Sequence, residues 1–212
     1  MADAPMDSVR ATGTPEALRD EPFESEIVDS ELVYEGRVWD VRSDTLRYGG
    51  DEIVRQYVDH PGASAIVAVD EEQRVLLIQQ YRHPIRHRDW EIPAGLLDIA
   101  GESPLETAQR ELVEEADLTA AQWEPLLSVF TTPGGNDEVV HIFLARGLSE
   151  VGKAHAREAE EADIRIEWVP LAEAVSGVLA GRLRNGILAL GILAAAEAVR
   201  RLPAPTAGAA GG

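Results

Sequence analysis

Residues 95–118 read GLLDIAGESPLETAQRELVEEADL and carry the clearest structural signal in the chain. Ser103, Pro104 and Glu106 match a capping box: serine caps a helix, proline takes its first position, and glutamate takes its third. This pattern predicts a helix over residues 104–116 that follows a glycine-containing loop.

The expected helix has an apolar face with an acidic edge. At about 100° per residue, one set of apolar side chains falls on a single stripe that should pack on a sheet: Leu105, Ala108, Leu112 and Ala116. Glu111 and Glu115 are four residues apart and are therefore neighbours beside that stripe, and Glu114 lies one step further around. Two carboxylates about 5 Å apart repel by roughly 3 kcal/mol at an effective dielectric of about 20.

Two interpretations account for this acidic edge. Arg110 offsets part of the repulsion if it pairs with Glu114 or reaches back to Glu102, and a divalent cation would offset more. Clustered carboxylate oxygens suit hard cations such as Mg²⁺ or Mn²⁺. The alternative is a solvated acidic helix face.

The rest of the chain alternates short β-rich runs with two more helical patterns. Strands are expected over residues 27–34, 38–46, 53–58, 63–69, 75–80, 123–131, 139–145 and 164–170, and further helices over 171–180 and 187–202. The runs 63–69 and 75–80 are expected to form a buried hairpin that turns at residues 70–73. Such an order predicts an α+β or α/β layered domain.

Composition limits the function. With 38 acidic and 19 basic residues the net charge is −19, which argues against general nucleic-acid binding. The chain has no cysteine, which excludes disulfides and thiolate metal sites. We expect no secretory signal, no membrane span and a cytoplasmic location. The acidity has a simpler alternative explanation, since net charge also keeps proteins soluble.

The stretch 95–118 resembles the signature box of the Nudix hydrolase family. That box has glycine, five residues, glutamate, seven residues, then Arg-Glu-aliphatic-x-Glu-Glu-x-Gly-aliphatic; Glu102, the run 110–116 and Leu118 match it. Two positions differ: six residues separate Gly95 from Glu102, and Asp117 replaces the final glycine. The extra residue falls in a loop, and aspartate can adopt the left-handed conformation of a helix end.

The resemblance implies a magnesium site, in which Mn²⁺ can substitute. Its carboxylate ligands would be Glu111, Glu114 and Glu115, and the backbone carbonyl of Ala94 or Gly95 would add an oxygen. The resemblance also implies a structural ion pair that ties loop to helix, formed by Glu102 and Arg110.

Flanking segments resemble the ADP-ribose and nucleotide-sugar pyrophosphatase group. They are residues 77–95 and residues 132–138, where Pro133 follows the box by fifteen residues. Candidate substrate contacts are Arg82 for a phosphate, Glu91 for a ribose hydroxyl or a metal, Glu138 for the ribose, and Trp39 for adenine. Three of these have a structural alternative: Arg82 as a surface charge, Glu91 as a hydrogen-bond acceptor, and Trp39, like Tyr34 and Tyr48, as a core aromatic. The alternative for Pro133 and Gly134 is a tight turn.

The acidic run 158–163 carries the expected catalytic base. In this group a glutamate from a mobile loop here takes a proton from the attacking water, which makes Glu161 the first candidate and Glu160 the second. The alternative is a solvated acidic loop. Glu115 is also expected to be catalytic, so that Glu115→Gln lowers turnover by orders of magnitude and leaves the fold intact. The implied reaction splits a nucleoside diphosphate sugar, with ADP-ribose giving AMP and ribose 5-phosphate.

The resemblance also implies a domain plan and a fold. The fold is α/β: a Nudix α/β/α sandwich around a mixed sheet over residues 61–202. An antiparallel β extension over residues 25–60 is expected to join two subunits in a homodimer. Residues 1–24 and 203–212 are expected to be disordered. The rival functions are a pyrophosphatase for another nucleotide sugar or dinucleotide, of the GDP-mannose type, and a ligand-binding module without turnover.

Overall fold

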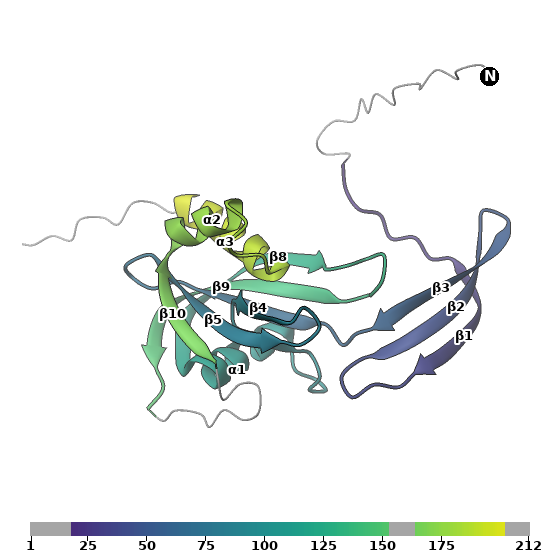
Figure 1. Cartoon of the computed structure of the whole chain (residues 1–212), viewed down its shortest axis with the longest axis horizontal. Helices are drawn as coiled ribbons and strands as arrows, with labels where there is room; N and C mark the ends of the chain where they lie inside the picture. Colours follow the sequence, from purple (N-terminus) through teal and green to yellow (C-terminus); the bar gives the residue numbers. More distant parts are fainter. Residues whose placement is uncertain (1–17, 153–163, 202–212) are drawn as a thin grey trace, which may run out of the picture.

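The first part of the chain forms a separate three-stranded antiparallel sheet. The structure is a computed structural model that describes residues 18–152 and 164–201. β1 (Glu26–Tyr34), β2 (Asp40–Tyr48) and β3 (Asp51–Asp59) pair in chain order. This sheet extends beside the body of the molecule (Figure 1). All nine residues of β1 are exposed, including the apolar Ile27 and Val33.

The body contains two further sheets. The first has the order β7-β4-β9-β8, made of β7 (Ala94–Leu96), β4 (Ala63–Ala68), β9 (Val139–Glu150) and β8 (Leu118–Phe130). β4 runs parallel to β9, whereas the other pairs are antiparallel, so this sheet is mixed. The second is antiparallel, with the order β10 (Arg165–Pro170), β5 (Arg74–Arg82) and β6 (His87–Glu91).

Helices cover the body on two sides. α1 (Pro104–Ala116) lies on one side, and α2 (Leu171–Leu179) and α3 (Gly186–Arg201) lie on the other (Figure 1). Alternate residues of β4 enter the two cores: Ile66 packs in the cluster that contains Leu112 of α1, and Val67 packs in the cluster that contains Ile192 of α3. The expected α/β/α sandwich around a mixed sheet is therefore confirmed.

The expected hairpin of residues 63–69 and 75–80 is wrong. Both runs are buried strands, but they join different sheets, and only Val69 and Val75 form an isolated bridge. The turn between them does form, since the backbone N–H of Asp70 donates to the carbonyl of Arg74. Continuous apolar runs show that a strand is buried on both faces, but they do not specify its neighbours. The strands β6 and β7 were not expected at all.

Several expectations concern chain ends and membranes. Disorder was expected over residues 1–24 and 203–212. Residues 18–25 form no helix or strand. Residues 1–17 and 202–212 lie outside the described residues. Within the described ranges, no helix is long and apolar enough to cross a membrane.

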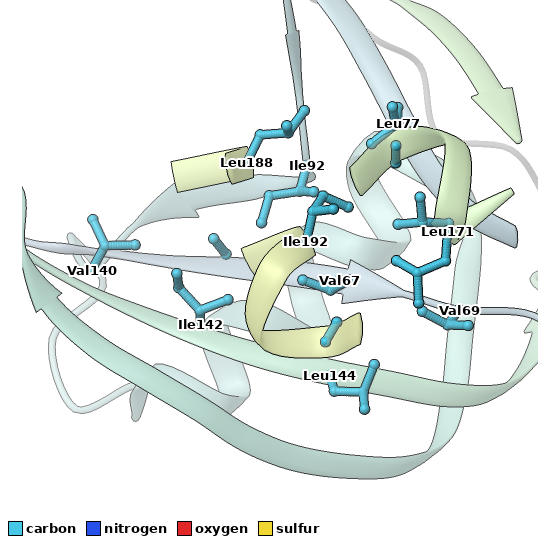
Figure 2. Packing of buried hydrophobic residues seen from close by; sticks show 14 of the residues in the cluster. Val67, Val69, Leu77, Ile92, Val140, Ile142, Leu144, Leu171, Leu188 and Ile192 are labelled. Atoms are coloured by element: carbon cyan, nitrogen blue, oxygen red, sulfur yellow. The ribbon is translucent and has the colours of Figure 1, made fainter. Parts of the chain in front are cut away.

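Gly191 lets α3 approach the central sheet. Ile192 and Leu188 of α3 lie over Val67 and Ile142 (Figure 2). A Cβ at position 191 would come within 2.9 Å of both Ile92 Cδ1 and Val67 Cγ2. We expect Gly191→Ala to lower the free energy of unfolding by about 1–3 kcal/mol through overpacking.

Denaturant unfolding measures this effect, and Gly186→Ala is the control. A Cβ at Gly186, the first residue of α3, meets nothing within 4 Å. The control should therefore change the free energy of unfolding by no more than roughly 0.5 kcal/mol. Equal effects of the two substitutions would contradict the packing argument.

Candidate active site

α1 begins and ends at defined residues. The Ser103 hydroxyl accepts the backbone N–H of Glu106, and the Glu106 side chain accepts the backbone N–H of Ser103. Asp117 ends the helix in the left-handed conformation, with φ 55° and ψ 34°. The expected capping box and the expected conformation of Asp117 are both confirmed. Because α1 begins and ends at fixed residues, the side of the helix on which each of its carboxylates lies is fixed as well.

Arg110 joins the loop to the carboxylates of α1. Its Nη2 lies 3.0 Å from Glu102 Oε2, and its Nη1 lies 2.5 Å from Glu111 Oε1 and 3.1 Å from Glu114 Oε2. Hydrogen bonding to Glu102, supported by the charge of Glu111, raises the pKa of Arg110. One cation thus offsets part of the repulsion among three carboxylates, including both partners expected from the sequence.

Glu115 and Glu111 face the strand β7, which contains Ala94 and Gly95. Glu115 is buried at 5% exposure, and its Oε2 accepts the backbone N–H of Ala94 at 2.9 Å. Position 95 has no room for a Cβ, which would overlap the carboxyl group of Glu111. Glycine at this position therefore lets the carboxyl group of Glu111 lie directly against β7.

The chemistry of these donors fits a hard divalent cation. Glu111, Glu114 and Glu115 present carboxylate oxygens within two helical turns, and the peptide of Ala94 lies against Glu115. Among residues 18–152 and 164–201, no three acidic or histidine side chains are already gathered around a single point. Since Arg110 contacts Glu111 and Glu114, a cation at this edge would compete with its guanidinium for their oxygens.

The pair of Glu102 with Arg110 makes stability depend on pH. Hydrogen bonding to Arg110, aided by Thr107, lowers the pKa of Glu102 below its ordinary value of 4.5. A lowered pKa in the folded state stabilises the fold above the ordinary value, and this contribution is lost as pH falls through the lowered value.

We therefore expect Glu102→Gln to destabilise the protein near neutral pH, with the difference from wild type shrinking as pH falls below 4.5. Denaturant unfolding at a series of pH values, with EDTA present, measures this difference. Glu173→Gln, the same chemical change at an exposed carboxylate of α2, is the control. A pH-independent difference for Glu102→Gln would contradict the assignment.

Arg82 and Glu91, which the sequence suggests as separate contacts, form one ion pair. Arg82 Nε donates to Glu91 Oε1 at 2.7 Å and Nη2 donates to Oε2 at 2.6 Å, so both carboxylate oxygens are engaged. Glu91 is buried, whereas the Arg82 side chain is 43% exposed. The Nε–Nη2 edge of Arg82 is thus occupied by a carboxylate.

A cavity of about 470 Å³ lies beside this pair. It is bounded by β6, by the segment before α3, and by the end of the loop before β9. Its polar lining consists of Arg82, Asp89, Glu91, Glu138, Arg184 and Asn185. Ala94 also lines it, so the cavity reaches the start of β7, which contacts Glu115. Asp89, Arg184 and Asn185 were not expected from the sequence.

Glu138 and Trp39 are linked through His60. Glu138 accepts the hydroxyl of Thr131 at 2.6 Å, and its Oε1 lies 3.7 Å from His60 Nε2. The ring of Trp39 stacks on His60, with centroids 5.6 Å apart. Trp39 is 46% exposed, and Tyr34 and Tyr48 are exposed too, so the alternative that these aromatics are core residues is wrong. His60 was missed because a lone histidine carries no sequence signal.

Two further expectations concern loops. Residues 132–136 form a tight turn, in which the backbone N–H groups of Gly135 and Asn136 donate to the carbonyl of Thr132. The candidate bases Glu160 and Glu161 lie outside the described residues.

Comparison with known proteins identifies relatives. A family model described as the NUDIX domain matches residues 58–188. The ADP-ribose pyrophosphatase of Mycobacterium tuberculosis is 46% identical over 170 residues, which cover 80% of this chain and 82% of that protein. The ADP-ribose pyrophosphatase of Bacillus subtilis is 36% identical over 140 residues, which cover 66% of this chain and 75% of that protein.

Among solved structures, a protein described as an ADP compounds hydrolase aligns with a TM-score of 0.71 at 20% identity. The alignment covers 86% of this chain and 97% of that one, and it shows a shared fold.

Proposed function

The chain belongs to the Nudix hydrolase family, and from that premise we propose that it hydrolyses the pyrophosphate bond of a nucleoside diphosphate sugar, with ADP-ribose as the substrate. The products are AMP and ribose 5-phosphate. The observation that carries this proposal is the acidic edge of α1, where Glu115 is buried against Ala94 of β7, which borders the cavity. The two relatives described above, both ADP-ribose pyrophosphatases, support the choice of substrate.

In this proposal Glu111, Glu114 and Glu115 hold Mg²⁺, with Mn²⁺ as a substitute, and a carbonyl of Ala94 or Gly95 adds an oxygen. Bound Mg²⁺ neutralises charge on phosphate oxygens and lowers the pKa of a coordinated water. Arg110 holds Glu102 against the helix, so the loop stays in place when a ligand enters. Glu91 fixes the orientation of Arg82 at the cavity wall.

The remaining roles are those that the family resemblance implies; Glu138 also lines the cavity. Glu138 accepts a ribose hydroxyl, and Trp39, held on His60, stacks on adenine. Glu161, or Glu160 in its place, accepts the proton of the attacking water. Substitution of each glutamate by glutamine, with pH profiles of turnover, distinguishes the two candidates.

A panel of nucleoside diphosphate derivatives tests the proposal. The purified chain is incubated with Mg²⁺ and ADP-ribose, GDP-mannose or a dinucleotide, and phosphatase then releases phosphate from any monophosphate product. We expect the highest kcat/KM for ADP-ribose and no turnover in EDTA. A preference for GDP-mannose would replace the substrate, and the absence of turnover with every compound would favour a ligand-binding module.

We also propose a homodimer formed through the sheet β1-β2-β3. Within the described residues, β1 exposes apolar side chains and its outer edge pairs with no other strand. We expect sedimentation to give the mass of a dimer, and Val33→Asp to shift it toward the monomer. Leu179→Asp, an equal change at an exposed apolar residue of α2, is the control. A wild-type monomer with full activity would reject the dimer.

A further inference from the structure

Arg184 is a basic residue of the cavity to which neither the family signature nor the proposed mechanism gives a role. It lies between α2 and α3, is exposed, and lines the same cavity as Glu91 and Ala94. Within residues 18–152 and 164–201 it forms no ion pair with an acidic side chain. In the same region Arg82 is bound to Glu91, and Arg110 is bound to Glu102, Glu111 and Glu114.

The neighbouring residue holds Arg184 in place. Asn185 Nδ2 donates to Asp89 Oδ2 at 3.0 Å, which ties the segment to β6. Asn185 Oδ1 accepts the backbone N–H of Leu188 at 3.0 Å, which ties it to the first turn of α3. Leu188 is fully buried, so residue 185 is fixed at the base of the cavity wall. The backbone at Arg184 is therefore held at the cavity, and only its side chain is free to move.

The charge of the cavity suggests what Arg184 binds. Asp89, Glu91 and Glu138 make the lining acidic, and Arg82 is already neutralised by Glu91. A diphosphate cannot approach carboxylates without a cation to compensate, and a guanidinium with free donors matches phosphate geometry. The carboxylates suit the hydroxyls of a sugar instead, because they accept hydrogen bonds.

We propose that Arg184 is a substrate-binding residue that contacts the diphosphate from the side of the cavity opposite to α1. The inference rests on the proposed function. It adds to the proposed Mg²⁺ a cationic contact with the diphosphate that a side chain of the protein supplies. Arg184 binds the diphosphate equally before and during the reaction, so its loss raises KM more than it lowers kcat.

Kinetics of Arg184→Ala test this inference, with Arg182→Ala as the matched control. Arg182 is exposed, lies two residues away and lines a different cavity, between α2 and β10, so the control removes the same charge. We expect Arg184→Ala to lower kcat/KM for ADP-ribose by about 10- to 100-fold, mostly through KM. Arg184→Lys should recover part of the loss, and Arg182→Ala should resemble wild type.

Inhibition by ADP identifies the part of the substrate that is contacted. ADP has the diphosphate without the second sugar, so Arg184→Ala should weaken its inhibition by the same factor as it raises KM. If ADP inhibits the variant as well as wild type, or if both alanine variants behave alike, the inference is wrong. Failure of wild type to hydrolyse ADP-ribose is a separate result, which rejects the proposed function itself.

Discussion

Replacing Glu115 with glutamine is expected to leave the fold intact and to lower turnover of ADP-ribose by about 100-fold or more. Glu115 is buried, and its carboxylate accepts the backbone N–H of Ala94. The amide oxygen of glutamine accepts the same bond, so packing and the loop position are kept while the charge is lost. A bound cation contributes several kcal/mol to catalysis, and each 1.4 kcal/mol is about tenfold in rate.

Three measurements make this prediction specific. Unfolding and circular dichroism should match wild type, kcat should fall, and the Mg²⁺ concentration for half-maximal activity should rise. Glu173→Gln, an identical change on the surface of α2, should alter none of these. Near-normal turnover of Glu115→Gln in Mg²⁺ would remove the acidic edge of α1 from the mechanism.

The features that the sequence predicted well are local. The start of α1 follows from Ser103, Pro104 and Glu106, which lie within one turn, and its end follows from Asp117. Ala108, Leu112 and Ala116 of the expected apolar stripe pack in the core, whereas Leu105 at the start of α1 is only half-buried. The stripe was predictable because helical periodicity depends only on neighbouring residues. For the same reason, most strands begin or end within a few residues of the bounds predicted from the sequence.

Strand pairing was predicted poorly because it depends on residues far apart in the chain. β4 pairs with β9, more than seventy residues later, rather than with β5, which follows it directly. β7 was missed because its three residues include a glycine and because, in the part of the chain that the structure describes, it pairs with no strand other than β4. The predicted helix could therefore be trusted in detail, while the sheet order could not.

The candidate site shows the same division. Glu111 and Glu115 were found because their spacing along one helix has a physical meaning. The engagement of Arg82 by Glu91 was not foreseen, since it depends on the pairing of β5 with β6. Arg184 belongs to no motif, and only the fold brings it to the cavity that Ala94 borders.

Gly95→Ala is expected to lower kcat by roughly 100-fold without a comparable loss of stability, because a misplacement of about 1 Å at a reacting centre can cost that much. Gly95 is in β7, paired with Ser64, in a conformation that alanine also adopts. The added Cβ would overlap the carboxyl group of Glu111, and that flexible side chain is the part able to move. The substitution therefore displaces the carboxylate of Glu111 and leaves the backbone of β7 in place.

The measurement pairs turnover with the dependence of rate on Mg²⁺. If Glu111 is a ligand, its displacement weakens the apparent affinity for Mg²⁺ as well as kcat, while the free energy of unfolding in EDTA stays close to that of wild type. Gly152→Ala adds the same methyl group where nothing lies within 4 Å, and it should be neutral in all three measurements. If Gly95→Ala keeps the kcat and the Mg²⁺ dependence of wild type, Glu111 does not act from the position that it occupies against β7. The assignment of the acidic edge as a metal site would then rest on Glu114 and Glu115 alone.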